Sequence, residues 1–276
     1  MTRQAAEQVE DPRGAVVVID DVVVRRHTTE HLILDGIDWT VRAGEHWALL
    51  GGNGAGKTTL LRLLGALMHP TTGTVEVLGA RLGRVDVRDL RARIGHVTTA
   101  QRVPEDLTAH TVVLTGHTGT VQPLWRRYDD EVRERAHGLL AELGVKELAE
   151  RPYGVCSGGQ RARILIARAL MADPALLLLD EPFNALDLPS REDLIEALFQ
   201  LAERRPRLAT VTVTHHLEEL SPAIGHALLL REGRILAQGP VARVLTGPQL
   251  TACFGRDITV TRRDGRWSAY SERRTV

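Results

Sequence analysis

The 276-residue sequence has few cysteines, no net charge and no long hydrophobic run, and each of these shortages argues against a class of protein. Its two cysteines, Cys156 and Cys253, lie far apart, which excludes a disulfide framework and every zinc pattern built on cysteine. The purest apolar run, 175–179, is far shorter than the about 18 residues that a membrane-spanning helix needs. The first 14 residues carry acids and no apolar segment, unlike a signal peptide. We therefore expect a cytoplasmic chain in a reducing compartment, with at most a peripheral role at a membrane.

The formal net charge is zero because 35 basic side chains balance 35 acidic ones. A nucleic-acid-binding protein usually carries a clear basic excess, so no nucleic-acid partner is expected. The basic side chains are unevenly divided, since 33 are arginines and only Lys57 and Lys146 are lysines. A lysine in such a chain marks a position where a compact ammonium on a slim stem is needed and the broad guanidinium fork does not serve.

Segments typical of strands alternate with segments typical of helices along most of the chain, after a polar segment, 1–14, that we expect to be a flexible tail. This alternation predicts an α/β fold with a largely parallel sheet. Between two predicted helices, residues 115–128 lack a clear period, so an exposed loop is expected there. The predicted helices cover 57–68, 129–143, 159–172 and 191–204. The predicted strands cover 15–24, 32–41, 47–50, 75–78, 175–179, 209–214, 227–230, 234–237, 258–261 and 267–270.

A phosphate-binding loop, G-x-x-x-x-G-K-[ST], follows an apolar strand and opens a helix, which is the context that this motif requires. Its glycines let the backbone fold around a phosphate, so that successive N–H groups and the positive helix end point at the anion. Lys57 is expected to reach the β- and γ-phosphates, and Thr58 to provide a hydroxyl for Mg²⁺. Thr59 is expected to donate a further hydrogen bond to a phosphate. The residues of the motif are Gly51, Gly52, Asn53, Gly54, Ala55, Gly56, Lys57 and Thr58.

A second candidate site lies where the apolar run 175–179 ends in Asp180 and Glu181. Asp180, at the carboxyl end of a buried strand, suits a role in holding Mg²⁺ directly or through water. Glu181 follows at once, in a position to polarise a water for attack on a γ-phosphate. Ligands gather at the carboxyl ends of parallel strands, so both acids are expected beside the phosphate loop.

Between these motifs lies Cys156-Ser157-Gly158-Gly159-Gln160, and together the three motifs resemble the ATP-binding cassette (ABC) ATPase family. The family signature usually reads LSGGQ, and here Cys156 replaces its leucine as a small packing residue. Asn184-Ala185-Leu186-Asp187 resembles the D-loop, and His215 matches the switch histidine.

The resemblance covers about residues 15–240 and implies a P-loop NTPase core with a mostly parallel sheet. It also implies an N-terminal antiparallel β-subdomain and an inserted helical subdomain at about 86–172. Residues 241–276 then form a short C-terminal extension with a β-hairpin around Asp264-Gly265. The arginines of this extension are expected on a charged hairpin face.

The resemblance also implies a mechanism in which two cassettes, a homodimer or a pair of related chains, dimerise head to tail around ATP and Mg²⁺. Ser157 and Gly159 contact a γ-phosphate held by the partner cassette, and Asp187 bridges the dimer. Glu181 and His215 are then catalytic. Gln101 joins them as a catalytic residue and Mg²⁺ ligand, although it follows the Ile-Gly-x-Val segment somewhat later than is usual in the family.

Two further positions bear on ligand binding. The family stacks an aromatic residue on adenine, and the matching stretch here has none. Arg26 could stack in its place, and a solvated arginine fits the same pattern equally well. His27 and His31 are spaced as on a helix in an extended stretch, so a surface position is expected and no metal site.

These implications favour a stand-alone, Mg²⁺-dependent ATPase subunit of an importer-like transporter. It would sit on the inner face of the plasma membrane and dock on a separate permease through about 102–128. The alternative is a soluble ABC ATPase that acts on a non-membrane partner, such as a cofactor-assembly complex. Glu181 and His215 count against a third class, a nucleotide-binding regulator without turnover. The transported molecule is not written in this chain, because specificity belongs to the partner.

Overall fold

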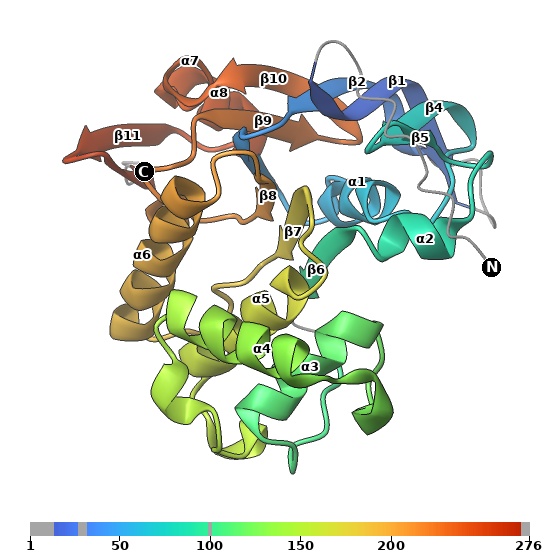
Figure 1. Cartoon of the computed structure of the whole chain (residues 1–276). Coiled ribbons are helices and arrows are strands. Elements are labelled where there is room, and N and C mark those ends of the chain that lie inside the picture. The colour runs from blue at the N-terminus through green and yellow to red at the C-terminus, as the bar shows by residue number, and fades with distance from the viewer. Residues whose placement is uncertain (1–13, 27–31, 99–100, 272–276) are drawn as a thin grey trace.

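The computed structural model describes residues 14–26, 32–98 and 101–271, so most of the predicted tail and both His27 and His31 lie outside the described residues. Figure 1 shows two sheets in the upper part of the molecule and a group of helices below them. The predicted α/β fold, with its parallel sheet, antiparallel β-subdomain and inserted helices, is confirmed. In the part of the chain that is described, no helix has both the length and the apolar character for crossing a bilayer.

The main sheet has six strands in the order β10-β9-β3-β8-β7-β6. All neighbours are parallel except β10, which runs antiparallel to β9. Both faces of β7 are covered, and its four leucines are fully buried. The carboxyl ends of β3, β8, β7 and β6 therefore meet at one edge of the sheet. These strands are β3 (His46–Gly51), β6 (Ile94–Thr98), β7 (Leu176–Asp180), β8 (Ala209–Val213), β9 (His226–Arg231) and β10 (Arg234–Pro240).

A second, antiparallel sheet has the order β2-β1-β4-β5, and helix α1 (Lys57–Leu64) packs between the two sheets. Trp39 and Trp47 meet edge to face in this core with ring centroids 5.4 Å apart, as packing residues should. Helix α1 ends at Leu64, short of the predicted 57–68, because Gly65 caps it. The strands are β1 (Ala15–Arg25), β2 (Leu32–Arg42), β4 (Thr72–Val77) and β5 (Ala80–Arg81).

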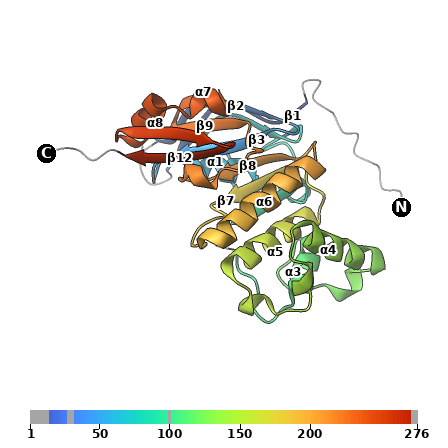
Figure 2. The same ribbon diagram turned by 90° about the vertical axis from the view of Figure 1, so that its left-hand side faces the viewer.

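Helices cover the other face of β6 and β7, as Figure 2 shows from the side. The prediction of a loop from residue 115 is wrong, because α3 continues to Thr118 and ends at Gly119, which adopts a left-handed conformation. Its residues 109–115 are all buried, so the helix shows no polar face and no helical period. The helices are α3 (Ala109–Thr118), α4 (Asp130–Glu142), α5 (Gly158–Leu170) and α6 (Leu188–Arg204).

The interval 86–172, predicted as the helical subdomain, also contains β6 of the main sheet and the short helix α2 (Val87–Arg91) beside it. Short 3₁₀ turns connect the longer helices, and a fourth follows β8. They are η1 (Trp125–Arg127), η2 (Lys146–Leu148), η3 (Tyr153–Val155) and η4 (Leu217–Glu219).

The C-terminal extension packs on the sheet through two helices that the sequence did not predict, α7 (Val241–Val244) and α8 (Gly247–Phe254). The predicted hairpin around Asp264-Gly265 is present as β11 (Ile258–Arg263) and β12 (Arg266–Ser271). Arg266 holds the hairpin to α6, because its Nη1 lies 2.5 Å from Oε2 of Glu192. The extension is thereby attached to the helix that follows the acidic strand end.

Candidate active site

The phosphate loop connects β3 to α1 and depends on glycine for steric reasons. Gly54 and Gly56 have φ angles of 76° and 106°, a region that favours glycine. A Cβ atom on Gly56 would lie 2.7 Å from Cδ2 of Leu34 and 2.9 Å from the carbonyl oxygen of Ile33. Strand β2 therefore presses against the loop and leaves no room for a side chain at its last glycine.

The loop ends in the amino terminus of α1, where Gly56 provides no side-chain cap. The N–H groups of the first turn can therefore bind an anion. Lys57 is buried at this point, and its Nζ donates to the carbonyl oxygens of Gly51 and Gly52 at 2.7 and 2.9 Å. Burial lowers the pKa of Lys57, while the nearby charges of Glu181 and Asp180 act in the opposite direction. The loop lysine and the strand-end acids thus lie in one electrostatic site.

Asp180 and Glu181 differ in backbone and environment. Asp180 is the last residue of β7. Burial raises its pKa, repulsion from Glu181 raises it further, and Lys57 lowers it. Glu181 has a left-handed backbone with a φ of 51°, which costs about 1–2 kcal/mol for a residue other than glycine. Its N–H donates to the carbonyl of Val213, 3.1 Å away, so a bond to β8 offsets part of this strain.

His215 follows β8 and faces Glu181, with its Nδ1 3.4 Å from Oε1 of the carboxylate. Both side chains line a cleft of about 210 Å³ together with Asn184 and Arg191. The turn that carries the histidine is held by Thr214, whose hydroxyl donates to the carboxylate of Glu219 and accepts from the backbone N–H of His216. The structure therefore brings two of the three predicted catalytic residues together.

Gln101 lies just beyond β6, and its N–H donates to the carbonyl of Thr98, 3.1 Å away. Thr98 is paired with Asp180 across the β6–β7 ladder, so Gln101 belongs to the same edge of the sheet. Arg26 is the residue that follows β1, and its side chain is exposed.

The signature residues begin α5. Ser157 caps this helix reciprocally with Gln160: the Ser157 hydroxyl accepts from the Gln160 N–H, and the Ser157 N–H donates to the Gln160 side chain. A Cβ atom on Gly159 would lie 2.6 Å from Cβ of Ser190, so glycine lets α5 approach α6 closely. Asp187 caps α6 by accepting from the N–H of Ser190, and hydrogen bonds from the side chain and then the backbone of Ser190 lower the pKa of Asp187. The signature and the D-loop segment are therefore neighbours.

The sequence offered no signal for a second cleft, of about 260 Å³, beside the phosphate loop. The loop forms one wall, and Arg231, Glu232, Cys253 and Phe254 form the other. Cys253 lies about 200 positions after the loop, so no local pattern connects the two. Cys156, by contrast, is buried as predicted, and burial raises its pKa. A raised pKa favours the inert thiol over the thiolate.

Comparisons with known proteins identify the family of this chain. The family model for ABC transporters matches residues 34–184. The chain is 39% identical over 248 residues to the uncharacterized ABC transporter ATP-binding protein YlmA of Bacillus subtilis, covering 89% of this chain and 93% of that protein. It is 33% identical over 244 residues to the phosphonates import ATP-binding protein PhnC 2 of Synechococcus sp., covering 86% and 90%. The dimeric, post-hydrolysis ATP-binding cassette MJ0796 with ADP and Pi superposes with a TM-score of 0.70 at 26% identity, covering 82% and 98%.

We expect Asp180→Asn to raise the melting temperature of the nucleotide-free protein at pH 7. The folded-state pKa of Asp180 lies above its unfolded value, so the unfolded chain loses this proton first and stability falls as the pH rises between the two. Asparagine does not ionise, so the gain over wild type should shrink as the pH is lowered toward the ordinary carboxyl range. Thermal melts across this pH range measure the effect.

The matched control is Asp187→Asn. The folded-state pKa of Asp187 is lowered, so its charge stabilises the folded protein at pH 7 and this contribution is lost at acid pH. The control should therefore shift the melting temperature in the opposite direction. A lower melting temperature for Asp180→Asn at pH 7, or a gain that does not change with pH, contradicts the argument.

Proposed function

The chain belongs to the ABC transporter family of ATP-binding proteins and is an ATPase, and on that premise we propose that it powers an importer as a separate subunit. One observation carries the catalytic part of the proposal. The phosphate loop, the strand-end acids and His215 share one edge of the sheet, with Glu181 and His215 only 3.4 Å apart. This edge therefore holds, in one place, hydrogen-bond donors for the phosphates and a carboxylate, Glu181, that can act as a base.

The acid pair fits a magnesium ion. Asp180 is partly buried beside the carboxylate of Glu181, and Lys57 is the cation that counters both. A divalent cation favours oxygen ligands and would offset the remaining negative charge. Asp180, the Thr58 hydroxyl and Gln101 would hold it, and it would neutralise charge that develops on the phosphates.

The residues of the chain then divide the work of hydrolysis. The loop N–H groups and Lys57 bind the β- and γ-phosphates and hold the γ-phosphorus in position. Glu181 accepts a proton from the attacking water. The oxygen of this water bonds to the γ-phosphorus while the bond from that phosphorus to the β–γ bridging oxygen breaks, and ADP leaves. His215 donates to the γ-phosphate and keeps Glu181 oriented. Arg26 is the candidate for contact with adenine.

The arrangement of the signature supports a head-to-tail dimer, formed by two copies or with a related cassette. Ser157 and the amino terminus of α5 form a phosphate-binding end, and Asp187 lies beside them at the start of α6. Ser157 and Gly159 would bind a γ-phosphate from the partner, and Asp187 would bridge the pair.

The helical layer supports docking on a permease. Three large apolar side chains of the segment 102–128 are exposed to solvent, namely Val121, Leu124 and Trp125, which are 54%, 45% and 53% exposed. Exposed apolar groups gathered in one segment are typical of an interaction surface. We propose that they bind a membrane subunit and keep the ATPase on the inner face of the plasma membrane.

Glu181→Gln should keep ATP binding, trap an ATP-bound dimer and nearly abolish hydrolysis, because the amide cannot accept the proton from water. Gel filtration with ATP and a phosphate-release assay measure the two effects. Glu203→Gln, on the exposed side of α6, is the control and should behave as wild type. Unchanged turnover in Glu181→Gln would overturn the assignment of the base.

Ser157→Asp should separate the two roles of the signature serine. Aspartate caps a helix as well as serine does, so the fold should be retained. Its carboxylate would repel a γ-phosphate, so hydrolysis should fall. Mixing this variant with Lys57→Ala should restore activity in part, since one of the two composite sites in the mixed dimer has an intact loop and an intact signature. Activity that no mixture restores argues against head-to-tail pairing.

Leu124→Ser together with Trp125→Ser should abolish co-purification of a membrane protein from solubilised membranes, while hydrolysis by the purified chain stays unchanged. Leu236→Ser, an exposed apolar position on β10, is the matched control. Mass spectrometry identifies the retained proteins. Recovery of soluble partners alone would favour the alternative function in complex assembly.

A further inference from the structure

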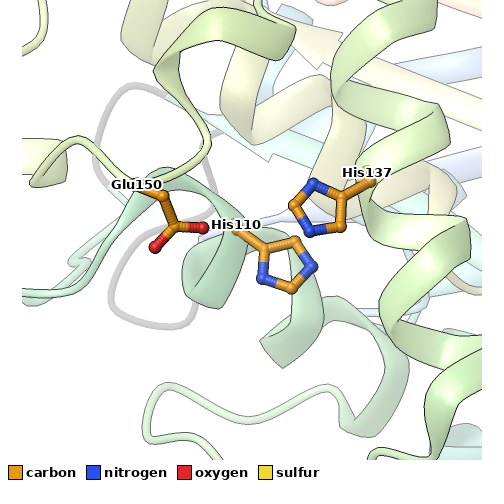
Figure 3. A group of neighbouring side chains, drawn as sticks. All are labelled: His110, His137 and Glu150. Carbon is orange, nitrogen blue, oxygen red and sulfur yellow. The ribbon is translucent and has the colours of Figure 1, made fainter.

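Three side chains of metal-ligating type meet in the helical layer. They are His110 on α3, His137 on α4 and Glu150 in the turn after η2, and Figure 3 shows them gathered from these three elements. One ligand atom from each lies within 4.8 Å of the other two. None of the three belongs to the phosphate loop or the acidic strand end. We propose that they form a binding site for a divalent transition metal ion of the zinc type.

The hydrogen bond of His110 prepares it as a ligand. Its Nε2 lies 3.1 Å from the backbone carbonyl oxygen of Arg133, which can only accept. The neutral ring therefore carries its proton on Nε2 and keeps a free lone pair on Nδ1. Metal-binding histidines are usually oriented in this way by a carbonyl or carboxylate on their other nitrogen. Burial lowers the pKa of His110, which favours the neutral ring that a metal requires.

The second imidazole is aligned with the first. The rings of His110 and His137 are stacked, with centroids 3.9 Å apart and planes 15° apart. Zinc–nitrogen bonds of about 2.0–2.1 Å in a tetrahedron place neighbouring ligand atoms about 3.3 Å apart. A metal ion lies in the plane of each imidazole that binds it, so one of the two stacked rings must turn out of the stack before both can bind the same ion. The ligand atoms already lie within 4.8 Å of one another, so this rotation has to bring them closer by about 1.5 Å at most.

Glu150 provides the third ligand, and it lies on the side from which an ion would enter the site. It is exposed, so its carboxylate can rotate toward the rings, and the fourth position is left for water. The negative charge of Glu150 raises the pKa of His110 and would attract a cation. The nearby guanidinium of Arg133 lowers that pKa and would repel a cation. Two imidazoles select zinc-type ions, while the oxygen ligands of the phosphate site suit magnesium.

A bound ion would reinforce a junction that the backbone already forms. The N–H of His110 donates to the carbonyl of Ala149, and the N–H of Ala109 donates to that of Arg151, each at 2.9 Å. These bonds join the start of α3 to the turn that carries Glu150. The ion would add α4 through His137 and so hold the three elements of the helical layer together.

The test is a titration of the purified full-length chain, stripped with EDTA, with Co²⁺ as a spectroscopic probe in the presence of excess Mg²⁺. We expect visible absorption bands that saturate at one equivalent and disappear when Zn²⁺ is added. Loss of an outer-shell partner costs about 10–100-fold in metal affinity, so loss of a ligand in His137→Ala should cost at least as much. Zn²⁺ should also raise the melting temperature of wild type, and His137→Ala should lose this shift.

Two further variants sharpen the test. Arg133→Gln keeps the backbone carbonyl and removes the opposing charge, so it should tighten binding. Glu150→Gln lies on the surface, where it does not threaten folding, and should weaken binding. His69→Ala, at an exposed position after α1, is the control and should bind as wild type does. Absence of Co²⁺ bands in wild type, or equal affinity in His137→Ala and wild type, would overturn the proposal.

Discussion

The central strands β3, β7 and β8 are covered on both faces. A charged side chain is therefore accommodated only at the ends of these strands, where it can reach solvent or a partner. Residues 176–179 of β7 are fully buried, and burial of each leucine contributes about 1.5–3 kcal/mol. An unpaired charge within such a strand would cost far more than a leucine contributes. The acids at the end of β7, the histidine after β8 and the loop after β3 therefore lie at the carboxyl edge, where the nucleotide chemistry is concentrated.

Several groups at that edge are energetically unfavourable, and packing elsewhere in the fold offsets their free-energy cost. Lys57 is buried, the pKa of Asp180 is raised, and Glu181 adopts a left-handed backbone. Three neighbouring packing layers hold these groups in position: α1 between the sheets, the helices on the far face, and the C-terminal helices beside the loop. Strain at the site is thus supported by large apolar cores rather than by local bonds alone.

The helical layer follows this edge along the chain and contains a separate polar cluster of its own. Gln101 lies between β6 and α3, so it links the sheet edge to the layer that carries the signature helix α5. The cluster of His110, His137 and Glu150 lies within that layer, where backbone bonds already join its elements. An ion there would stiffen the layer without entering the nucleotide site.

Features that depend on short spacing were determined by the sequence alone. The phosphate loop, the buried strand before Asp180 and the hairpin around Asp264-Gly265 each rest on a few consecutive residues and their backbone preferences. Helix α3 escaped prediction because its residues 109–115 are all buried and therefore show no amphipathic period. The alternation of segments was enough for the α/β class, since each segment buries its own apolar face.

Only the tertiary structure decided what lies beside what. It brought Glu181 within 3.4 Å of His215, set Cys253 against the phosphate loop, and gathered His110 and His137 from two helices. Such contacts join residues that are far apart in the chain, and their geometry follows from how layers pack. No local preference encodes that packing, so it could be seen only after the layers were assembled.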